Sequence, residues 1–292
     1  MSPKPLRMRK AVIVSPGGPP DAGAVERGVN YLRRYFEQVQ IMPHAIPAPD
    51  RAVSYLAASD DERAADLNAA FADPDVDLIL SSRGGYGCAR LLDKLDFSLP
   101  DRGVRLAGYS DVTALHLAMD RHGFGIPVTA PMATKIADVS AAEAACFEAA
   151  LAERAQSFPI TVIKPGTACG RPLAGNLTVT ASLAGTAHLP DFTGRILVIE
   201  DVNEAPYRLD RCLTQLDQCG MLGRCAALVA GEFTGVADSE LDALLRRFAD
   251  RINGPVVRGF PFGHTRFLAA FSWRQNWVIE QGQVRIAPQN LL

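Results

Sequence analysis

Short apolar runs alternate with helical patterns along the first half of the chain. Each run has the length of a strand and is followed by residues whose apolar positions recur at intervals of three and four. These runs predict strands at 11–15, 39–42, 76–81 and 105–108, and helices at 22–36, 60–72, 88–92 and 111–122. This repeated strand–helix order predicts an α/β fold with a parallel sheet. Ligands of such sheets bind beyond the carboxyl ends of the strands.

The second half of the chain mixes strand and helix signals. An alanine-rich helix is predicted at 141–155, and the following segment, 159–172, carries Pro, Gly and Thr without a helical period. We therefore place a domain boundary near 155–170, between an N-terminal α/β domain (1–155) and a C-terminal β/α domain (170–292). Beyond it we predict strands at 195–200, 226–231 and 255–259, helices at 207–219 and 238–252, and a hairpin within 273–286.

Composition and charge exclude several classes of protein. The 292 residues are 48% hydrophobic and 21% charged, with a net charge of −2, which is typical of a globular protein and offers no field for nucleic acid or an anionic membrane. The apolar run after the basic start is too short for a signal-peptide core, and no run is long enough to span a membrane. We therefore expect a cytoplasmic protein.

The six cysteines do not form a metal-binding pattern. They are Cys88, Cys146, Cys169, Cys212, Cys219 and Cys225. None belongs to a C-x-x-C pair, and no histidine stands at ligand spacing beside them. We predict reduced thiols within the core, and no metal.

Ser110 follows the strand predicted at 105–108 and stands at the start of a helical pattern. The first backbone N–H groups of a helix have no partner within it, and the helix dipole favours negative charge there. A serine at this place is either an N-cap or a nucleophile with part of an oxyanion hole beside it. The stretch alone leaves both interpretations open.

Two further polar residues follow apolar runs: Glu200 ends the strand predicted at 195–200, and His264 comes shortly after the strand predicted at 255–259. A serine nucleophile needs a base near neutral pH, histidine suits that task, and the imidazole needs a carboxylate to hold its tautomer. Ser110, Glu200 and His264 thus supply the three groups of a triad. Each also has an ordinary structural interpretation, and the spacing does not show that they meet.

A glycine-rich loop, Arg83-Gly84-Gly85-Tyr86-Gly87, follows the strand predicted at 76–81. Glycines let the backbone approach a ligand closely, so an N–H of this loop is a candidate for an oxyanion hole. The loop lacks the Lys-Ser/Thr ending of a P-loop and the spacing of a dinucleotide fingerprint. A plain tight turn is the alternative.

Four segments together resemble the LD-carboxypeptidase family of serine peptidases, which includes muramoyltetrapeptide carboxypeptidases and microcin self-immunity peptidases. The segments are 81–87, 108–116, 200–211 and 259–264, and they follow the family's order. The resemblance spans nearly the whole chain, from the loop at 14–16 to His264.

The resemblance implies a catalytic triad and a fold. It implies Ser110 as nucleophile, His264 as general base and Glu200 as the residue that orients it, with an oxyanion hole from the backbone N–H groups of Gly85 and Asp111. It also implies an active site between the two domains and a homodimer without metal or cofactor. Its substrate would be a murein peptide in peptidoglycan recycling, from which D-Ala is released at an L-D peptide bond.

Substrate recognition requires groups for the peptide's free carboxylate. Arg83 is a candidate because a guanidinium binds carboxylate bidentately, and we assign Tyr86 of the same loop to substrate binding. Glu204 and Arg211 are expected to belong to a structural network. Trp273 and Trp277 depart from the aliphatic ending expected of the family, and either pack in the hairpin or line a groove.

Three other functions remain open. A self-immunity peptidase of the same family would cleave a peptide–nucleotide antibiotic, and groove-lining tryptophans would favour it. A non-enzymatic α/β ligand-binding module would not depend on Ser110. An α/β-hydrolase esterase shares the order serine, acid, histidine, but the turn Gly-Tyr-Ser-Asp-Val lacks the second glycine of that elbow.

Overall fold

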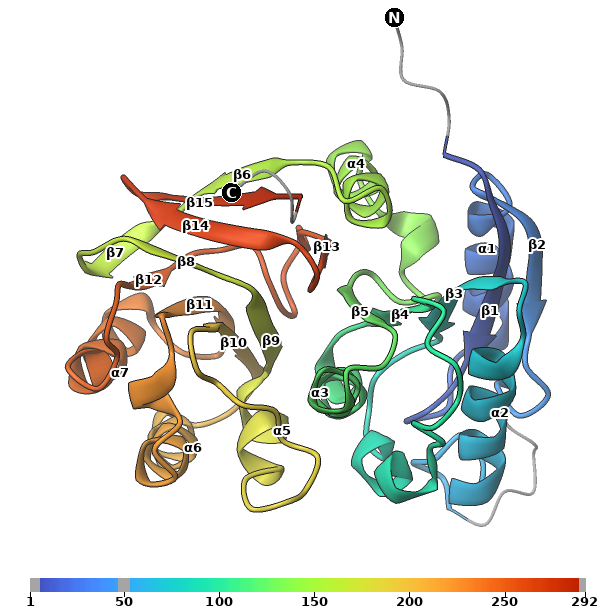
Figure 1. The fold of residues 1–292 in the computed structure, drawn as a ribbon, viewed down its shortest axis with the longest axis horizontal. Coiled ribbons are helices and arrows are strands. Elements are labelled where there is room, and N and C mark those ends of the chain that lie inside the picture. The colour runs from blue at the N-terminus through green and yellow to red at the C-terminus, as the bar shows by residue number, and fades with distance from the viewer. Residues whose placement is uncertain (1–5, 47–52, 289–292) are drawn as a thin grey trace, which may run out of the picture. The chain divides into compact units, whose positions relative to one another are not determined.

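The computed structural model describes residues 6–46 and 53–288, and the chain forms two compact units (Figure 1). Unit 1 is Met1–Glu148 and unit 2 is Ala149–Leu292. Both units combine helices with parallel strands, which confirms the predicted α/β class. None of the helices in the described part of the chain has both the length and the apolar character needed to span a bilayer.

Unit 1 is built on a parallel sheet. Its strands are β1 (Met8–Val14), β2 (Phe36–Ile41), β3 (Val76–Ser81), β4 (Arg105–Gly108) and β5 (Ile126–Thr129). Its helices are α1 (Ala22–Leu32), α2 (Asp60–Ala72), α3 (Thr113–His122) and α4 (Ala141–Leu151), which ends within unit 2. Three short 3₁₀ helices are η1 (Cys88–Lys94), η2 (Ser110–Val112) and η3 (Ile136–Asp138).

The strand order of unit 1 locates the edge at which a ligand would bind. The strands lie in the order β5-β4-β3-β1-β2, and each neighbouring pair is parallel. From β1 the chain adds β2 on one side, and it then adds β3, β4 and β5 on the other side. The order of the strands therefore reverses between β1 and β3. In doubly wound sheets this switch point opens a crevice at the carboxyl ends of the strands. The loops after β1 and β3 both begin at this point.

The structure shows how helix α2 begins and corrects the predicted end of helix α1. Helix α2 starts with a capping box, in which Ser59 and Glu62 satisfy each other's backbone N–H groups. The helix predicted at 22–36 ends at Leu32, because Phe36 opens β2 instead. Phe36 is buried and fits the helical spacing, so the pattern alone did not separate the two elements.

Unit 2 holds two sheets. Its strands are β6 (Gln156–Pro159), β7 (Thr161–Lys164), β8 (Ala168–Gly170), β9 (Pro172–Asn176), β10 (Ile196–Val202), β11 (Ala227–Thr234), β12 (Val256–Arg258), β13 (Phe271–Ser272), β14 (Asn276–Glu280) and β15 (Gln283–Ala287). Its helices are α5 (Leu177–Ser182), α6 (Pro206–Gln218) and α7 (Asp238–Ala249), with a 3₁₀ turn η4 (Leu222–Arg224).

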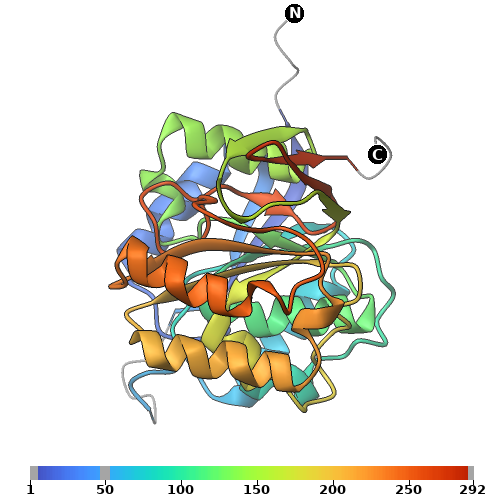
Figure 2. The same ribbon diagram turned by 90° about the vertical axis from the view of Figure 1, so that its left-hand side faces the viewer.

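The first sheet of unit 2 runs in the order β7-β12-β11-β10-β9, parallel except for β7. Helices α6 and α7 contact each other and lie side by side (Figure 2). The second sheet is antiparallel, in the order β6-β15-β14-β8. Its centre is the predicted hairpin, which turns at Gln281-Gly282 with positive φ at both residues.

The segment 155–170, where we placed a domain boundary, lies inside unit 2. It contributes β6 and β8 to the antiparallel sheet and β7 to the other sheet. These strands are short and partly exposed, so they lack the strong apolar alternation that would have revealed them.

Candidate active site

Ser110 occupies a strained strand-to-helix turn in unit 1. Strand β4 ends at Gly108, Tyr109 is fully extended, and Ser110, the first residue of η2, has φ +63°. Helix α3 follows directly after η2. Left-handed backbone is unfavourable for a residue with a Cβ, and strain of this kind gathers at functional sites. The turn presents a hydroxyl at the carboxyl end of a strand, which is also the place of the serine in the nucleophile elbow of α/β-hydrolases.

The glycine-rich loop after β3 lies against this serine. A Cβ added at Gly84 would stand 3.0 Å from both the Cβ and the Oγ of Ser110 and 3.5 Å from the backbone nitrogen of Asp111. Gly85 has φ +108°, a conformation that favours glycine. Within the described residues, neither the Gly85 nor the Asp111 backbone N–H donates a hydrogen bond. These two groups meet the requirement for donors beside a nucleophile.

The Asp111 side chain joins the serine turn to the end of the glycine-rich loop. Its Oδ2 accepts a hydrogen bond of 2.9 Å from the backbone N–H of Cys88. Burial raises the pKa of Asp111, while this hydrogen bond and the positive charge of Arg63 act in the opposite sense. The side chain of Asp111 thus fixes the serine turn against the loop, while its backbone N–H stays available as a donor.

Glu200 and His264 form a hydrogen-bonded pair in unit 2, although they are 64 residues apart in the sequence. The imidazole Nδ1 lies 2.8 Å from Oε2 of Glu200, whose side chain is fully buried, whereas that of His264 is 27% exposed. The hydrogen bond to Glu200 raises the pKa of His264, and burial opposes it. With Nδ1–H donating to the carboxylate, the neutral ring carries its lone pair on Nε2, which is the arrangement that a general base requires.

Two residues that the sequence did not single out hold the Glu200 carboxylate in place. The Asn176 amide donates to Oε1 of Glu200 (3.3 Å) and to Oδ1 of Asp201 (2.9 Å), while its carbonyl oxygen caps α5. Gly263 packs on the other side, where an added Cβ would lie 2.6 Å from the Cβ of Glu200. Its φ of +112° also favours glycine. The Gly-His order at 263–264 was the only sequence signal of this contact.

Arg83 and Tyr86 remain exposed in the glycine-rich loop. Arg83 donates to the Pro19 carbonyl at 3.2 Å and forms no ion pair with any described residue. Tyr86 is 54% exposed, and its ring centroid lies 6.0 Å from that of Tyr55. Both side chains can therefore reach a ligand, and their assignment to substrate binding stays a prediction.

The structure also gives the outcome of two other sequence expectations, on the Glu204 segment and on the cysteines. Glu204 pairs with Arg208 at 3.4 Å. Arg208 donates to the Tyr207 hydroxyl, and Arg211 lies over the same Tyr207 ring. Glu204 and Arg211 therefore belong to one structural network, as expected, although they do not pair directly. Cys88 and Cys225 are buried as predicted, but Cys169 and Cys219 are exposed.

Both tryptophans of the C-terminal segment are core residues. Trp273 and Trp277 have no exposed surface. The Trp277 ring packs against Phe260 and Phe271, each with a centroid separation of 4.8 Å. They do not line a groove, which removes the observation that favoured a peptide–nucleotide substrate.

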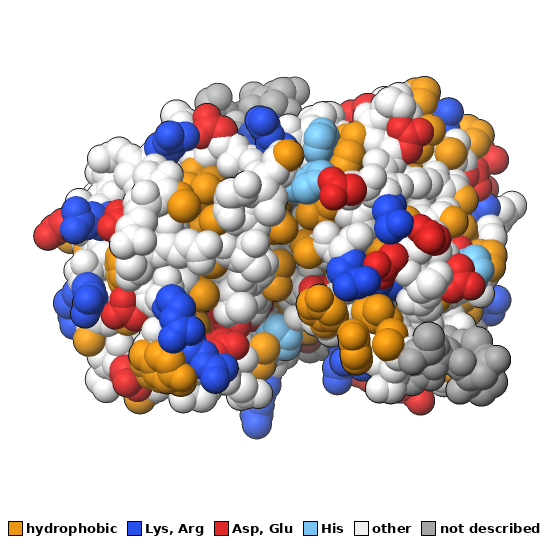
Figure 3. Space-filling model, turned by 90° about the horizontal axis from the view of Figure 1, so that it is seen from below, with side chains coloured by type: hydrophobic (Ala, Val, Ile, Leu, Met, Phe, Trp, Pro, Cys, Tyr) orange, Lys and Arg blue, Asp and Glu red, His pale blue; other side chains and the backbone are white. Residues whose placement is uncertain are grey.

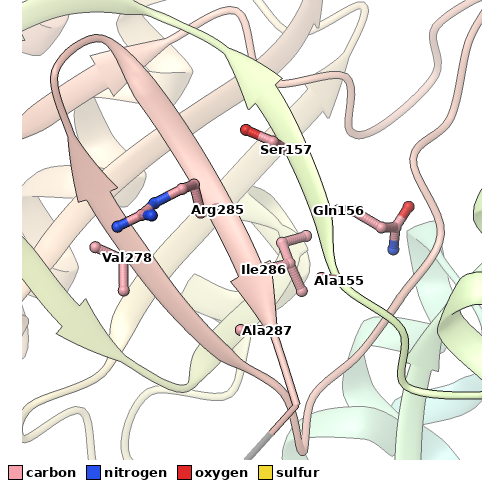
Figure 4. A pocket seen from close by; sticks show the side chains of 7 residues that line it. All are labelled: Ala155, Gln156, Ser157, Val278, Arg285, Ile286 and Ala287. Atoms are coloured by element: carbon pink, nitrogen blue, oxygen red, sulfur yellow. The ribbon is translucent and has the colours of Figure 1, made fainter. Parts of the chain in front are cut away.

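On the face that Figure 3 shows, the basic and acidic side chains of the described residues lie interspersed. A cavity of about 430 Å³ opens on the antiparallel sheet of unit 2 (Figure 4). It is lined by Ala155, Gln156, Ser157, Val278, Arg285, Ile286 and Ala287. None of the predicted site residues lines this cavity.

Comparison with known proteins identifies the family of the chain. Residues 12–129 match the LD-carboxypeptidase N-terminal domain and residues 169–273 match the LD-carboxypeptidase C-terminal domain. A Streptomyces coelicolor protein is 36% identical over 87% of this chain and 85% of its own length. The murein tetrapeptide carboxypeptidase of Pseudomonas aeruginosa is 33% identical over 79% of this chain and 81% of its own length.

Solved structures agree with this assignment. The muramoyltetrapeptide carboxypeptidase of Oxalobacter formigenes is 31% identical and matches with a TM-score of 0.82, covering 95% of this chain and 98% of that one. An MccF-like protein of Bacillus anthracis has a TM-score of 0.87 over 97% of each chain but only 20% identity, and so shares the fold alone. On its two matched domains and these relatives, the chain belongs to the LD-carboxypeptidase family.

Proposed function

We propose that this protein is a serine carboxypeptidase that releases D-Ala from murein tetrapeptides by hydrolysing an L-D peptide bond. Ser110 acts as nucleophile, His264 as general base and Glu200 as the group that orients the imidazole. The observation that carries the proposal is the buried Glu200 hydrogen-bonded to His264 Nδ1, in a chain whose strained Ser110 matches the family's nucleophile. The murein substrate is suggested by the relatives from P. aeruginosa and O. formigenes.

The proposed reaction proceeds through an acyl-enzyme. His264 Nε2 takes the Ser110 proton as Oγ bonds to the carbonyl carbon of the L-residue. The resulting oxyanion accepts hydrogen bonds from the backbone N–H groups of Gly85 and Asp111. His264 then gives the proton to the amine of D-Ala as the C–N bond breaks. Water, deprotonated by His264, then attacks the ester carbonyl. The bond from the carbonyl carbon to Oγ breaks, His264 returns the proton to Ser110 Oγ, and the shortened peptide leaves with a free carboxylate.

Arg83 is proposed to bind the free carboxylate of the peptide. Its exposed guanidinium makes no described ion pair, and a bidentate pair with a carboxylate would fix the end of the substrate. Lysine at this position keeps the charge but loses the fork geometry. R83K should therefore raise KM, and an unchanged kcat/KM would rule out the clamp.

The test uses two peptides that differ only in their terminal residue, and the variant Ser110→Ala. The protein should release D-Ala from L-Ala-γ-D-Glu-meso-diaminopimelyl-D-Ala but not L-Ala from the isomer with a terminal L-residue. Ser110→Ala should abolish release, since it removes the nucleophile. Cleavage of a peptide–nucleotide conjugate without D-Ala release would favour the self-immunity function. Full activity of Ser110→Ala would overturn the serine mechanism.

Location and assembly are proposed on the family resemblance alone. We propose that the protein acts in the cytoplasm as a homodimer during peptidoglycan recycling. Cell fractionation and light scattering test the two statements separately. A monomer with full activity would refute the homodimer.

A further inference from the structure

Arg63 is a buried cation that the proposed reaction does not use. It lies in the first turn of α2, and its side chain has no exposed surface. A fully buried arginine is rare unless its donors are all satisfied. The groups that Arg63 contacts therefore indicate which backbone segments it stabilises.

The guanidinium of Arg63 joins segments that are distant in the sequence. Nε donates to the Ala58 carbonyl at 3.1 Å, and Nη2 lies 2.5 Å from Oδ1 of Asp60. Nη1 donates to the carbonyl of Pro16, in the loop after β1, and to that of Gly87 at 3.1 Å, in the loop after β3. The planar Arg63 guanidinium thus bridges the loop after β1 and the loop after β3, at the switch point of the sheet.

The backbone of Gly85 is fixed from both sides by these contacts. On one side, the Gly84 carbonyl accepts from the N–H of Gly18 at 3.0 Å, and Gly18 belongs to the loop that Arg63 anchors at Pro16. On the other side, Arg63 holds the Gly87 carbonyl directly. Gly85 itself has few internal restraints, because it has no side chain and a positive φ. Its orientation therefore depends on the two anchored carbonyls.

Asp111, whose backbone N–H is the second donor of the proposed oxyanion hole, is connected to the same loop that Arg63 contacts. The Asp111 carboxylate accepts the backbone N–H of Cys88, the residue that follows Gly87. A Cβ at Gly87 would come within 2.8 Å of Nη1 of Arg63, and one at Gly17 within 3.0 Å of Oδ2 of Asp111. The loops after β1, β3 and β4 are therefore packed without spare volume around the guanidinium and the Asp111 carboxylate.

We propose that Arg63 is a positioning residue that holds the backbone donors of Gly85 and Asp111 in the geometry of an oxyanion hole. This inference rests on the proposed function, because the hole has meaning only for acyl transfer from Ser110. Arg63 acts on the transition state through the loop and does not touch the substrate. Its loss should therefore lower kcat and leave KM nearly unchanged.

The experiment compares Arg63→Met and Arg63→Lys with a control, Lys10→Met. Lys10 is also a largely buried cation of unit 1, paired with Asp73 at 2.8 Å, but it lies at the start of β1, away from the loops. Each variant is assayed for D-Ala release and for thermal unfolding, at a temperature where circular dichroism shows it to be folded. Ser110→Ala is run in parallel.

The expected result is a separation of activity from stability. Arg63→Met should lose about 100-fold in kcat, the cost of a displacement of about 1 Å in a catalytic group, with KM retained. Arg63→Lys should recover much of the Tm but little of the kcat, because an ammonium cannot span all four acceptors. Lys10→Met should lower the Tm and leave kcat unchanged.

The outcomes distinguish this inference from the proposed function. Wild-type kcat in a folded Arg63→Met or Arg63→Lys, with Ser110→Ala inactive, would overturn the role of Arg63 alone. Full activity of Ser110→Ala would overturn the proposed function itself. If neither Arg63 variant folds, Asp60→Asn carries the test, since it removes the anionic partner of the guanidinium. Arg90→Gln is its control, because Asp60 also pairs with Arg90. A lowered kcat at constant KM supports the role, and wild-type kcat overturns it.

Discussion

Replacing Ser110 with glycine should stabilise the protein while abolishing the proposed hydrolysis. Ser110 has φ +63°, and left-handed backbone costs a residue with a Cβ about 1–2 kcal/mol. Glycine removes that cost but gives the unfolded chain about 0.5–1 kcal/mol more conformational entropy to lose. The net expectation is a gain of about 0.5–1 kcal/mol over Ser110→Ala, which keeps the Cβ and the strain.

The assay is unfolding of the two inactive variants under identical conditions. For a chain of this size, a gain of about 1 kcal/mol raises the Tm by about 2–4 °C. Gln281→Gly is the matched control, because Gln281 has φ +50° in an exposed hairpin turn outside the candidate site. It should gain similar stability with unchanged activity. A Ser110→Gly variant less stable than Ser110→Ala, with Gln281→Gly stabilised, would refute the argument that the serine turn stores strain.

Three further predictions follow from the surroundings of the histidines and of Gly263. The hydrogen bond to Glu200 raises the pKa of His264, so kcat/KM should rise with pH through an apparent pKa above about 6.5. Glu200→Gln should lower this apparent pKa in a pH–rate profile. An unchanged apparent pKa would exclude His264 as the titrating base. Burial lowers the pKa of His116 to about 4, so its contribution to stability is complete above the unfolded pKa and is lost as the pH falls toward 4, by about 3 kcal/mol in total. His116→Gln should therefore show a smaller loss of unfolding free energy on acidification in urea titrations, and an equal loss would contradict the assignment. Gly263→Ala would place a Cβ 2.6 Å from that of Glu200, so kcat should fall about 100-fold by displacement of the carboxylate; wild-type kcat would show that the pair tolerates the shift.

The sequence predicted the central strands because each is a buried apolar run ended by a glycine or a polar residue. This holds for β3, β4 and β10, and it placed Ser110 and Glu200 correctly at or near the strand ends. It failed where burial is partial. Strands β6, β7 and β8 are short and half-exposed, so their hydrogen-bonding partners, not their apolar pattern, define them.

The candidate site was predictable in its residue types but not in its contacts. Glu200 lies within β10 and His264 in a bend after β12, and only the fold joins them across 64 positions. Arg63 follows Asp60, Asp61 and Glu62 in the sequence, a pattern typical of the solvated start of a helix. Only the fold shows that its guanidinium turns inward to carbonyls 47 and 24 residues away. Asn176 likewise has the signature of a helix cap and gains its second role from β10 beside it.

The most direct measurement is the rate and position of labelling by a fluorophosphonate, which traps an activated serine as a tetrahedral adduct. Peptide mapping should place the label on Ser110, with none on Ser110→Ala. Labelling should be slowed by about 1,000-fold or more in His264→Asn and Glu200→Gln, since each removes activation of the hydroxyl. A label on another residue, or Ser110 labelled at the wild-type rate without His264, would contradict the account.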